Sequence, residues 1–144
     1  MKKFFMLAIA LMASISIYAQ TPEWQQQLER LDKEFNELRE QRQWKGVVAN
    51  RKQYRKIFMV QPDSARMKFS QGTDLNLNFY YNYTCYLSLA DDKKEALSTF
   101  EYFTNRVTKE LDLIDVLSIN NDSDLDAIRE EPRFKACMER LEKW

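Results

Sequence analysis

The sequence predicts an all-α protein, and two observations carry this prediction. Of its 144 residues only two are Gly and three are Pro, and the long stretches between them are rich in Glu, Lys, Arg, Gln and Leu. This composition is typical of helices. Apolar residues also recur at spacings of three and four, which place them on one face of a helix, and no segment alternates convincingly as a strand would.

The first segment, residues 1–19, has the layout of a secretory signal peptide. Lys2 and Lys3 precede an uncharged apolar run over 4–17, and the neutral residues Tyr18 and Ala19 follow. The run is too short for an ordinary membrane span, although an uncleaved anchor remains the alternative. We expect cleavage after Ala19, which would make the mature protein periplasmic or secreted, without stable membrane insertion. The segment resembles signal peptides of the Bacteroidota.

The composition also excludes several kinds of chemistry. The chain has no His, which is the commonest general base and metal ligand, and no glycine-rich loop that could hold a phosphate. Loss of Lys2 and Lys3 with the leader lowers the basic count from 22 to 20, against 22 acidic residues, so the processed chain has a formal net charge of −2. The sequence therefore predicts no enzyme, no cofactor, no metal and no nucleic-acid partner.

Two helices are expected in the N-terminal part, over about 23–42 and 44–60. The first carries a narrow apolar seam, through which we expect weak self-association if the seam is not covered within one chain. The second has a basic exposed side, which is either an ordinary solvated face or a patch for an anion or a membrane surface. The seam consists of Trp24, Leu28, Leu31, Phe35 and Leu38, and the basic side of Arg51, Lys52, Arg55 and Lys56.

The remaining elements follow from their boundary residues. A connection over 62–74, with one helical turn inside it, leads to a helix over 75–90 that Thr73 or Asp74 caps. The turn Asp91-Asp92 is so short that a helix over 93–108 must run antiparallel to it. Periodicity does not separate helix from extended chain over 111–119. A short helix is expected near 123–130, and Pro132 opens the last helix.

The two central helices carry the pattern of a tetratricopeptide repeat. Large residues stand at Tyr80, Tyr83 and Leu87, a small one at Thr84, and Ala96 is followed four residues later by Phe100. Over about 77–142, the segments 81–90, 94–97 and 124–135 resemble the tetratricopeptide end-of-group domain, whose closing segment reads roughly Asp-Leu-Asp-x-Leu-Arg-x-x-Pro-Arg-Phe. The resemblance implies a short right-handed helical solenoid of about two hairpins and a C-terminal capping helix. It divides the chain into an N-terminal hairpin, 20–62, and an end-of-group-like domain, 63–144.

The same resemblance implies a non-catalytic adaptor that binds an unidentified protein through its concave helix face. Tyr80 and Tyr83 are expected in the core, because packing needs large residues there. The side chains left for a partner are Asn78, Tyr81, Asn82, Cys85 and Ser88. The alternative is a small-ligand-binding protein that uses the aromatic cluster of residues 79–86.

Two smaller features remain open at this stage. Cys85 and Cys137 are either free buried thiols or, in an oxidising compartment, a disulfide. The acidic residues Asp122, Asp124 and Asp126 lie where helix caps are expected, and they lack the Gly and the distal Glu of an EF-hand loop.

Overall fold

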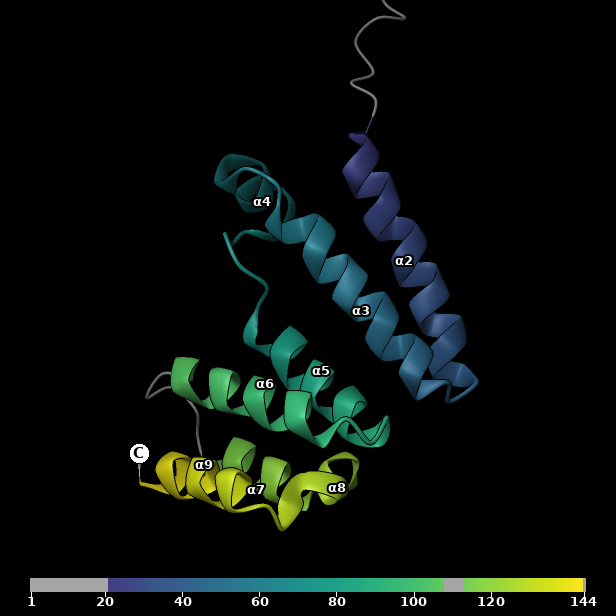
Figure 1. The fold of residues 1–144 in the computed structure, drawn as a ribbon. Helices are drawn as coiled ribbons and strands as arrows, with labels where there is room; N and C mark the ends of the chain where they lie inside the picture. The colour runs from purple at the N-terminus through teal and green to yellow at the C-terminus, as the bar shows by residue number, and fades with distance from the viewer. Residues whose placement is uncertain (1–20, 108–112, 144) are drawn as a thin grey trace, which may run out of the picture.

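The computed structural model describes residues 21–107 and 113–143, with the side chains of 113–115 excepted. All regular structure in these two segments is helical, so the predicted all-α class is confirmed (Figure 1). The predicted signal peptide, 1–19, lies outside the described residues. The elements are α2 (Glu23–Glu40), α3 (Trp44–Met59), α4 (Asp63–Ser70), α5 (Leu77–Leu89), α6 (Lys93–Arg106), α7 (Leu113–Asn121), η2 (Ser123–Leu125), α8 (Asp126–Arg129) and α9 (Pro132–Glu142).

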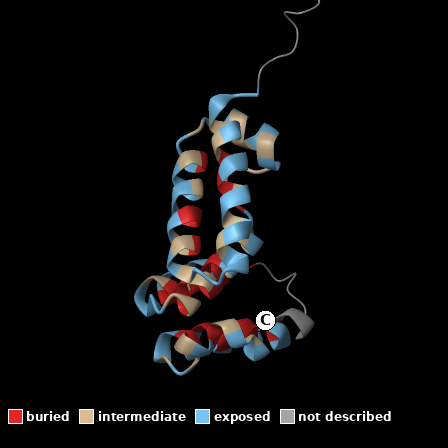
Figure 2. Cartoon of the chain, turned by 90° about the vertical axis from the view of Figure 1, so that its right-hand side faces the viewer, coloured by how far each residue is buried: buried red, intermediate tan, exposed pale blue. Residues whose placement is uncertain are grey.

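The helices form three successive layers along the molecule. The hairpin α2–α3 is followed by the hairpin α5–α6 and then by a layer of α7, α8 and α9 (Figure 1). Contacts between layers run from α3 to α5, from α6 to α9, and from α5 to η2 and α8. Buried residues line the inner sides of the helices, while the outer sides are exposed (Figure 2). Each hairpin thus buries its apolar stripe against the next one.

The connection after α3 differs from the expected single turn. It contains α4, which begins after Pro62 and runs for eight residues. Phe69 explains the extra length, because its ring packs edge-on against Trp24 at 5.1 Å and tilted against Phe58 at 6.5 Å. These contacts cover the top of the α2 seam. The sequence 111–119, which periodicity left undecided, is helical from Leu113 onward.

The core positions expected from the repeat pattern are buried. Tyr80 and Tyr83 are each 2 % exposed, and Thr84, Ala96 and Phe100 are fully buried. The small side chains on one helix leave room for the large ones on its neighbour, which lets α5 and α6 pack closely. Two residues of the α2 seam belong to this core, since Leu28 is fully buried and Leu31 is 7 % exposed. Trp24, Phe35 and Leu38 of the seam are partly buried.

The sequence predicts Thr73 or Asp74 as the N-terminal cap of α5, but neither residue caps the helix. The cap of α5 is Asn76, whose Oδ1 accepts the backbone N–H of Phe79 at 2.9 Å. Asp74 instead accepts hydrogen bonds from the hydroxyls of Tyr80 at 2.8 Å and Tyr102 at 2.9 Å, and it pairs with Arg106. One carboxylate thus ties the start of α5 to the end of α6.

The hydrogen bonds to Asp74 make the stability of the fold depend on pH. Burial alone would raise the pKa of Asp74, but the hydrogen bonds from Tyr80, Tyr102, the Leu75 N–H and Arg106 together hold that pKa below the ordinary value of an aspartate. Asp74 therefore stabilises the fold fully above its unfolded pKa, and this contribution is lost as the pH falls through the lower folded value. We expect Asp74→Asn to lower the thermal midpoint near neutral pH, with a smaller difference from the wild type at a pH of about 3. Thermal denaturation of both proteins at the two pH values measures this, and an equal difference at both would contradict it.

Candidate functional site

A small hollow lies where the two hairpins meet, between α2, α3 and α5. Its volume is about 200 Å³. We call it the hairpin hollow. It is lined by side chains from all three helices, namely Phe35 and Arg39 of α2, Arg51 of α3, and Phe79, Asn82, Tyr83 and Tyr86 of α5. The hollow includes one of the residues that the sequence assigned to a partner, Asn82.

Aromatic rings make the walls of the hairpin hollow rigid. The ring of Tyr86 packs edge-on against Phe35 with centroids 5.6 Å apart, and it stacks on Trp44 at 6.3 Å. Phe79 stacks on Tyr83 at 6.0 Å. Rings with only two rotatable bonds lose little entropy when they are packed, so these walls are preformed.

Arg51 has a structural role in the hairpin hollow, because its guanidinium is buried and fully engaged in contacts. It is 8 % exposed, and its guanidinium lies 4.2 Å from the ring centre of Phe35 and 4.6 Å from that of Tyr54. It pairs with Asp32 at 2.8 Å and donates a hydrogen bond to the Leu31 carbonyl at 3.1 Å. The expectation that Arg51 belongs to the exposed basic side of its helix is therefore wrong. Helical periodicity cannot tell that this side of α3 faces α2 and α5.

Arg39 and Asn82 are the polar groups that the hollow leaves available. Both side chains are exposed. Within the described residues Asn82 makes no side-chain hydrogen bond and Arg39 has no carboxylate partner, while the Arg39 guanidinium lies beside the Tyr86 hydroxyl. Arg39 lies 5.4 Å from the ring centre of Phe35. Burial raises the pKa of the Tyr86 hydroxyl, and the neighbouring Arg39 opposes that rise. The Arg39 guanidinium and the Asn82 amide thus lie beside an aromatic wall, where both can donate hydrogen bonds to an acceptor on a bound molecule.

The other residues assigned to a partner are placed differently. Asn78 is exposed on α5 but does not line the hollow. Cys85 and Ser88 are only 3 % and 2 % exposed, so the expectation that they are free to bind a partner needs correction. Tyr81 is half-buried, and its hydroxyl donates to Asp122 at 2.5 Å.

Cys85, Ser88 and Tyr81 are covered by the last layer of the fold. η2 and α8 pack on α5, so its side toward the C-terminal layer is closed and only the side toward α2 stays open. No local pattern in the sequence indicates which of these two sides of α5 is covered. Phe35 and Arg39 were missed as site residues. Their spacing of four on α2 was the one available clue, because it places both on the same face.

The acidic residues that follow α7 act as local structural groups. Asp122 accepts the backbone N–H of Asp124 at 3.0 Å, which caps η2. Burial raises the pKa of Asp124, helped by Asp122 and Asp126. Within the part of the chain that the structure describes, no three acidic or cysteine side chains are grouped so that they could hold a metal ion.

Both cysteines are free thiols in the interior. Cys85 lies 3.8 Å from Asp122, and burial together with the nearby carboxylates raises its pKa far above the usual thiol value. Cys137 accepts a hydrogen bond from Arg140 at 3.1 Å. A thiol with a raised pKa is a poor nucleophile at neutral pH, so Cys85 behaves as a packing residue.

No family model, no curated protein and no solved structure matches this chain. Among the helices of the described segments, none has the length and apolar character needed to cross a membrane.

Proposed function

We propose that the protein is an exported, non-catalytic interaction module, periplasmic or secreted, built as a short tetratricopeptide-like right-handed solenoid. The successive hairpins α2–α3 and α5–α6 and the closing helix α9 support this arrangement, because solenoids stack hairpins and need a terminal cap. The binding site in this proposal is the hairpin hollow.

One observation carries the proposal. Arg39 presents an exposed guanidinium that has no carboxylate partner in the described chain, and Asn82 presents an exposed amide, both beside the preformed wall of Phe35 and Tyr86. A guanidinium binds a carboxylate through paired hydrogen bonds, and an amide binds a peptide backbone. We therefore propose that the hollow receives a side chain of a partner protein, with its acceptor oxygens on Arg39.

The size of the hollow favours a protein partner over the small-ligand alternative. Pockets for small molecules are usually about 300–1,000 Å³ and bury most of the ligand. The hairpin hollow, at about 200 Å³, accommodates a single side chain. Most of the aromatic cluster of residues 79–86 is occupied in packing, with Tyr80 and Tyr83 buried.

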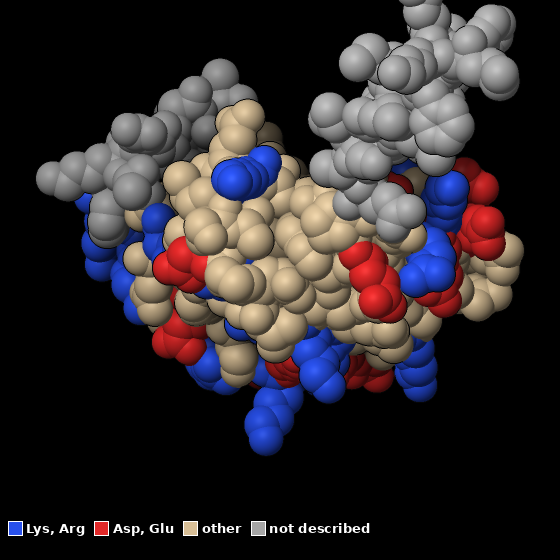
Figure 3. Space-filling view, turned by 90° about the horizontal axis from the view of Figure 1, so that it is seen from above, with Lys and Arg blue, Asp and Glu red and all other residues tan. Residues whose placement is uncertain are grey.

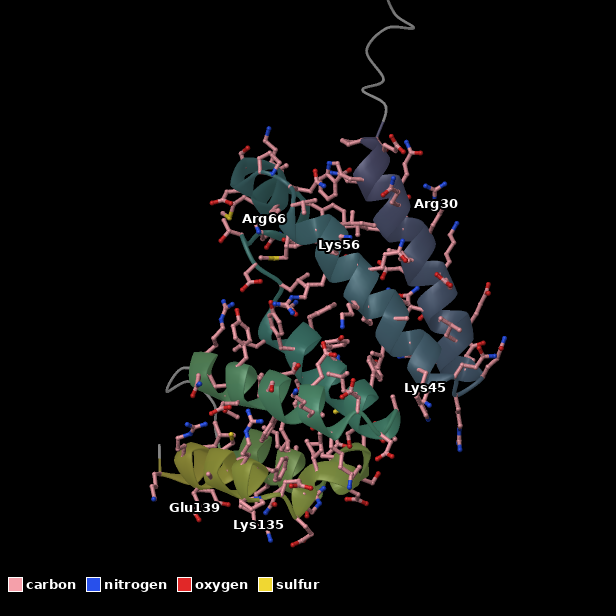
Figure 4. The ribbon with its side chains drawn as sticks, in the orientation of Figure 1. Arg30, Lys45, Lys56, Arg66, Lys135 and Glu139 are labelled. Atoms are coloured by element: carbon pink, nitrogen blue, oxygen red, sulfur yellow. The ribbon has the colours of Figure 1, made fainter. Side chains whose placement is uncertain are left out.

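The test is chemical crosslinking of the processed protein in its own envelope fraction, followed by identification of captured proteins. We expect Arg39→Glu/Asn82→Ala to reduce capture of the partner about tenfold or more, since a hydrogen bond to a charged group contributes about 1.5–3 kcal/mol. The matched control is Arg30→Glu/Asn78→Ala. It makes the same changes on α2 and α5 at exposed residues outside the hollow (Figure 4 labels Arg30).

Circular dichroism must first establish that both variants are folded. Capture by the wild type and the control, with loss in the hollow variant, would support the proposal. Equal capture by all three would place the binding surface elsewhere on the molecule. A ligand-induced rise in the thermal midpoint with small molecules, and no captured protein, would favour the alternative function.

A further inference from the structure

A second surface of the molecule lies outside the hairpin hollow, on the exposed side of α3. Lys45, Lys52 and Lys56 stand at relative positions of zero, seven and eleven, which brings them onto one side of the helix. All three are exposed, and Figure 4 labels Lys45 and Lys56 on α3. We call these three residues the α3 stripe.

The charge of the stripe is little compensated. α3 contains no acidic residue. Lys52 approaches Glu95 at 3.4 Å, but that Lys side chain is 68 % exposed, so the pair is weak in water. Among the described residues, Lys45 and Lys56 make no ion pair.

The α3 stripe leads to an exposed apolar corner at the end of the helix. Met59 is 39 % exposed and Val60 71 %, and Met67 of α4 is 49 % exposed. Arg66 donates to the sulfur of Met59 at 3.5 Å, which fixes α4 beside the end of α3. We call Met59, Val60 and Met67 the α3–α4 corner. Seen from above, this end of the molecule carries mostly uncharged side chains, with basic and acidic side chains among them and along its edges (Figure 3).

We propose that the α3 stripe and the α3–α4 corner dock the protein on an anionic membrane surface. Lysines beside projecting apolar side chains are the combination that binds such surfaces: the cations attract the headgroups, and the apolar groups enter the interface. This is peripheral binding, without insertion of a helix.

The shallow shape of the surface along α3 favours a lipid bilayer over an acidic protein as the binding partner. The shallow depression along this side is lined by α3 alone, from Ala49 to Met59, so no second helix forms a wall. A specific protein interface needs close shape complementarity, whereas a bilayer does not.

The experiment is co-sedimentation of the processed chain with vesicles of phosphatidylcholine, with and without phosphatidylglycerol, at low and high salt. We expect binding only to the anionic vesicles, weakening as salt increases. Lys52→Glu/Lys56→Glu should lower the affinity at least about tenfold. Val60→Ser/Met67→Ser should weaken binding without changing its dependence on salt.

The matched control is Lys135→Glu/Lys143→Glu on α9 and at its end, far from α4 along the molecule (Figure 4 labels Lys135). It makes the same charge change and, like the stripe variant, removes one exposed ion pair, here with Glu130. Retained binding in the control supports the docking surface. An equal loss in both variants would mean that overall charge alone acts, and would overturn the proposal.

Two further arms separate the remaining outcomes. Binding to polyglutamate but not to anionic vesicles would overturn the proposal in favour of an acidic protein partner. The hollow variant Arg39→Glu/Asn82→Ala should keep its vesicle binding, because Arg39 and Asn82 belong to the other surface. Failure of the docking surface and failure of the hairpin hollow are therefore distinguishable.

Discussion

Replacement of Phe100 by Ala is expected to lower the free energy of unfolding by about 3–5 kcal/mol. Phe100 is fully buried on α6, and its ring stacks on Phe134 of α9 with centroids 4.6 Å apart. Truncation removes this contact and leaves a cavity between the central hairpin and the last layer. Urea denaturation followed by far-UV circular dichroism measures the change.

Two further variants test the cause of this loss. Leu117→Ala, at a side chain that is 51 % exposed, should change stability by only about 0.5 kcal/mol. A double-mutant cycle with Phe134→Ala should give a coupling of about 0.5–1.5 kcal/mol. Additive effects of the two Phe substitutions would mean that the rings do not stabilise each other, against the packing described here.

Replacement of Arg51 by Ala is expected to cost about 2–3 kcal/mol. The substitution removes the hydrogen bonds of the guanidinium to the Leu31 carbonyl and to Asn50 Oδ1, and leaves the space between Phe35 and Tyr54 empty. The ion pair with Asp32 adds less, because the Asp32 side chain is 51 % exposed. The same denaturation measurement applies.

The control for Arg51 is its exposed neighbour on the same helix, Arg55. Arg55→Ala should cost no more than about 0.5 kcal/mol. Arg51→Lys should recover only part of the loss, since an ammonium cannot donate to several acceptors in the plane of a guanidinium. A loss for Arg55→Ala as large as that for Arg51→Ala would show that α3 is sensitive to any truncation, and not to the buried guanidinium.

The boundaries of most helices are set by cap and turn residues close to them in the sequence, so these boundaries could be predicted. Pro132 opens α9 because it lacks an N–H that the first turn does not need, and Asp92 caps α6 by accepting the N–H of Glu95 at 3.2 Å. Asp91 takes a left-handed backbone with φ of 63°, which closes the turn between α5 and α6. The extra length of α4 escaped prediction because it depends on contacts of Phe69 with distant residues.

The candidate site was only partly predictable for a related reason. Asn82 was identified because it lies on α5 outside the packing positions, and the structure places it in the hairpin hollow. Cys85 and Ser88 fit the same criterion in the sequence, yet both are buried. Periodicity gives the angle of a residue around its own helix. It does not say which neighbouring element covers that angle.

The sequence by itself determined the all-α class, the hairpin α5–α6 and the core role of Tyr80, Tyr83 and Phe100, because composition, turn chemistry and spacing act within one or two helices. Only the tertiary structure decided that Arg51 is buried, that Asp74 joins α5 to α6, and that the C-terminal layer closes one side of α5. These contacts join residues far apart in the chain. They depend on how whole helices pack, and no local pattern encodes that packing.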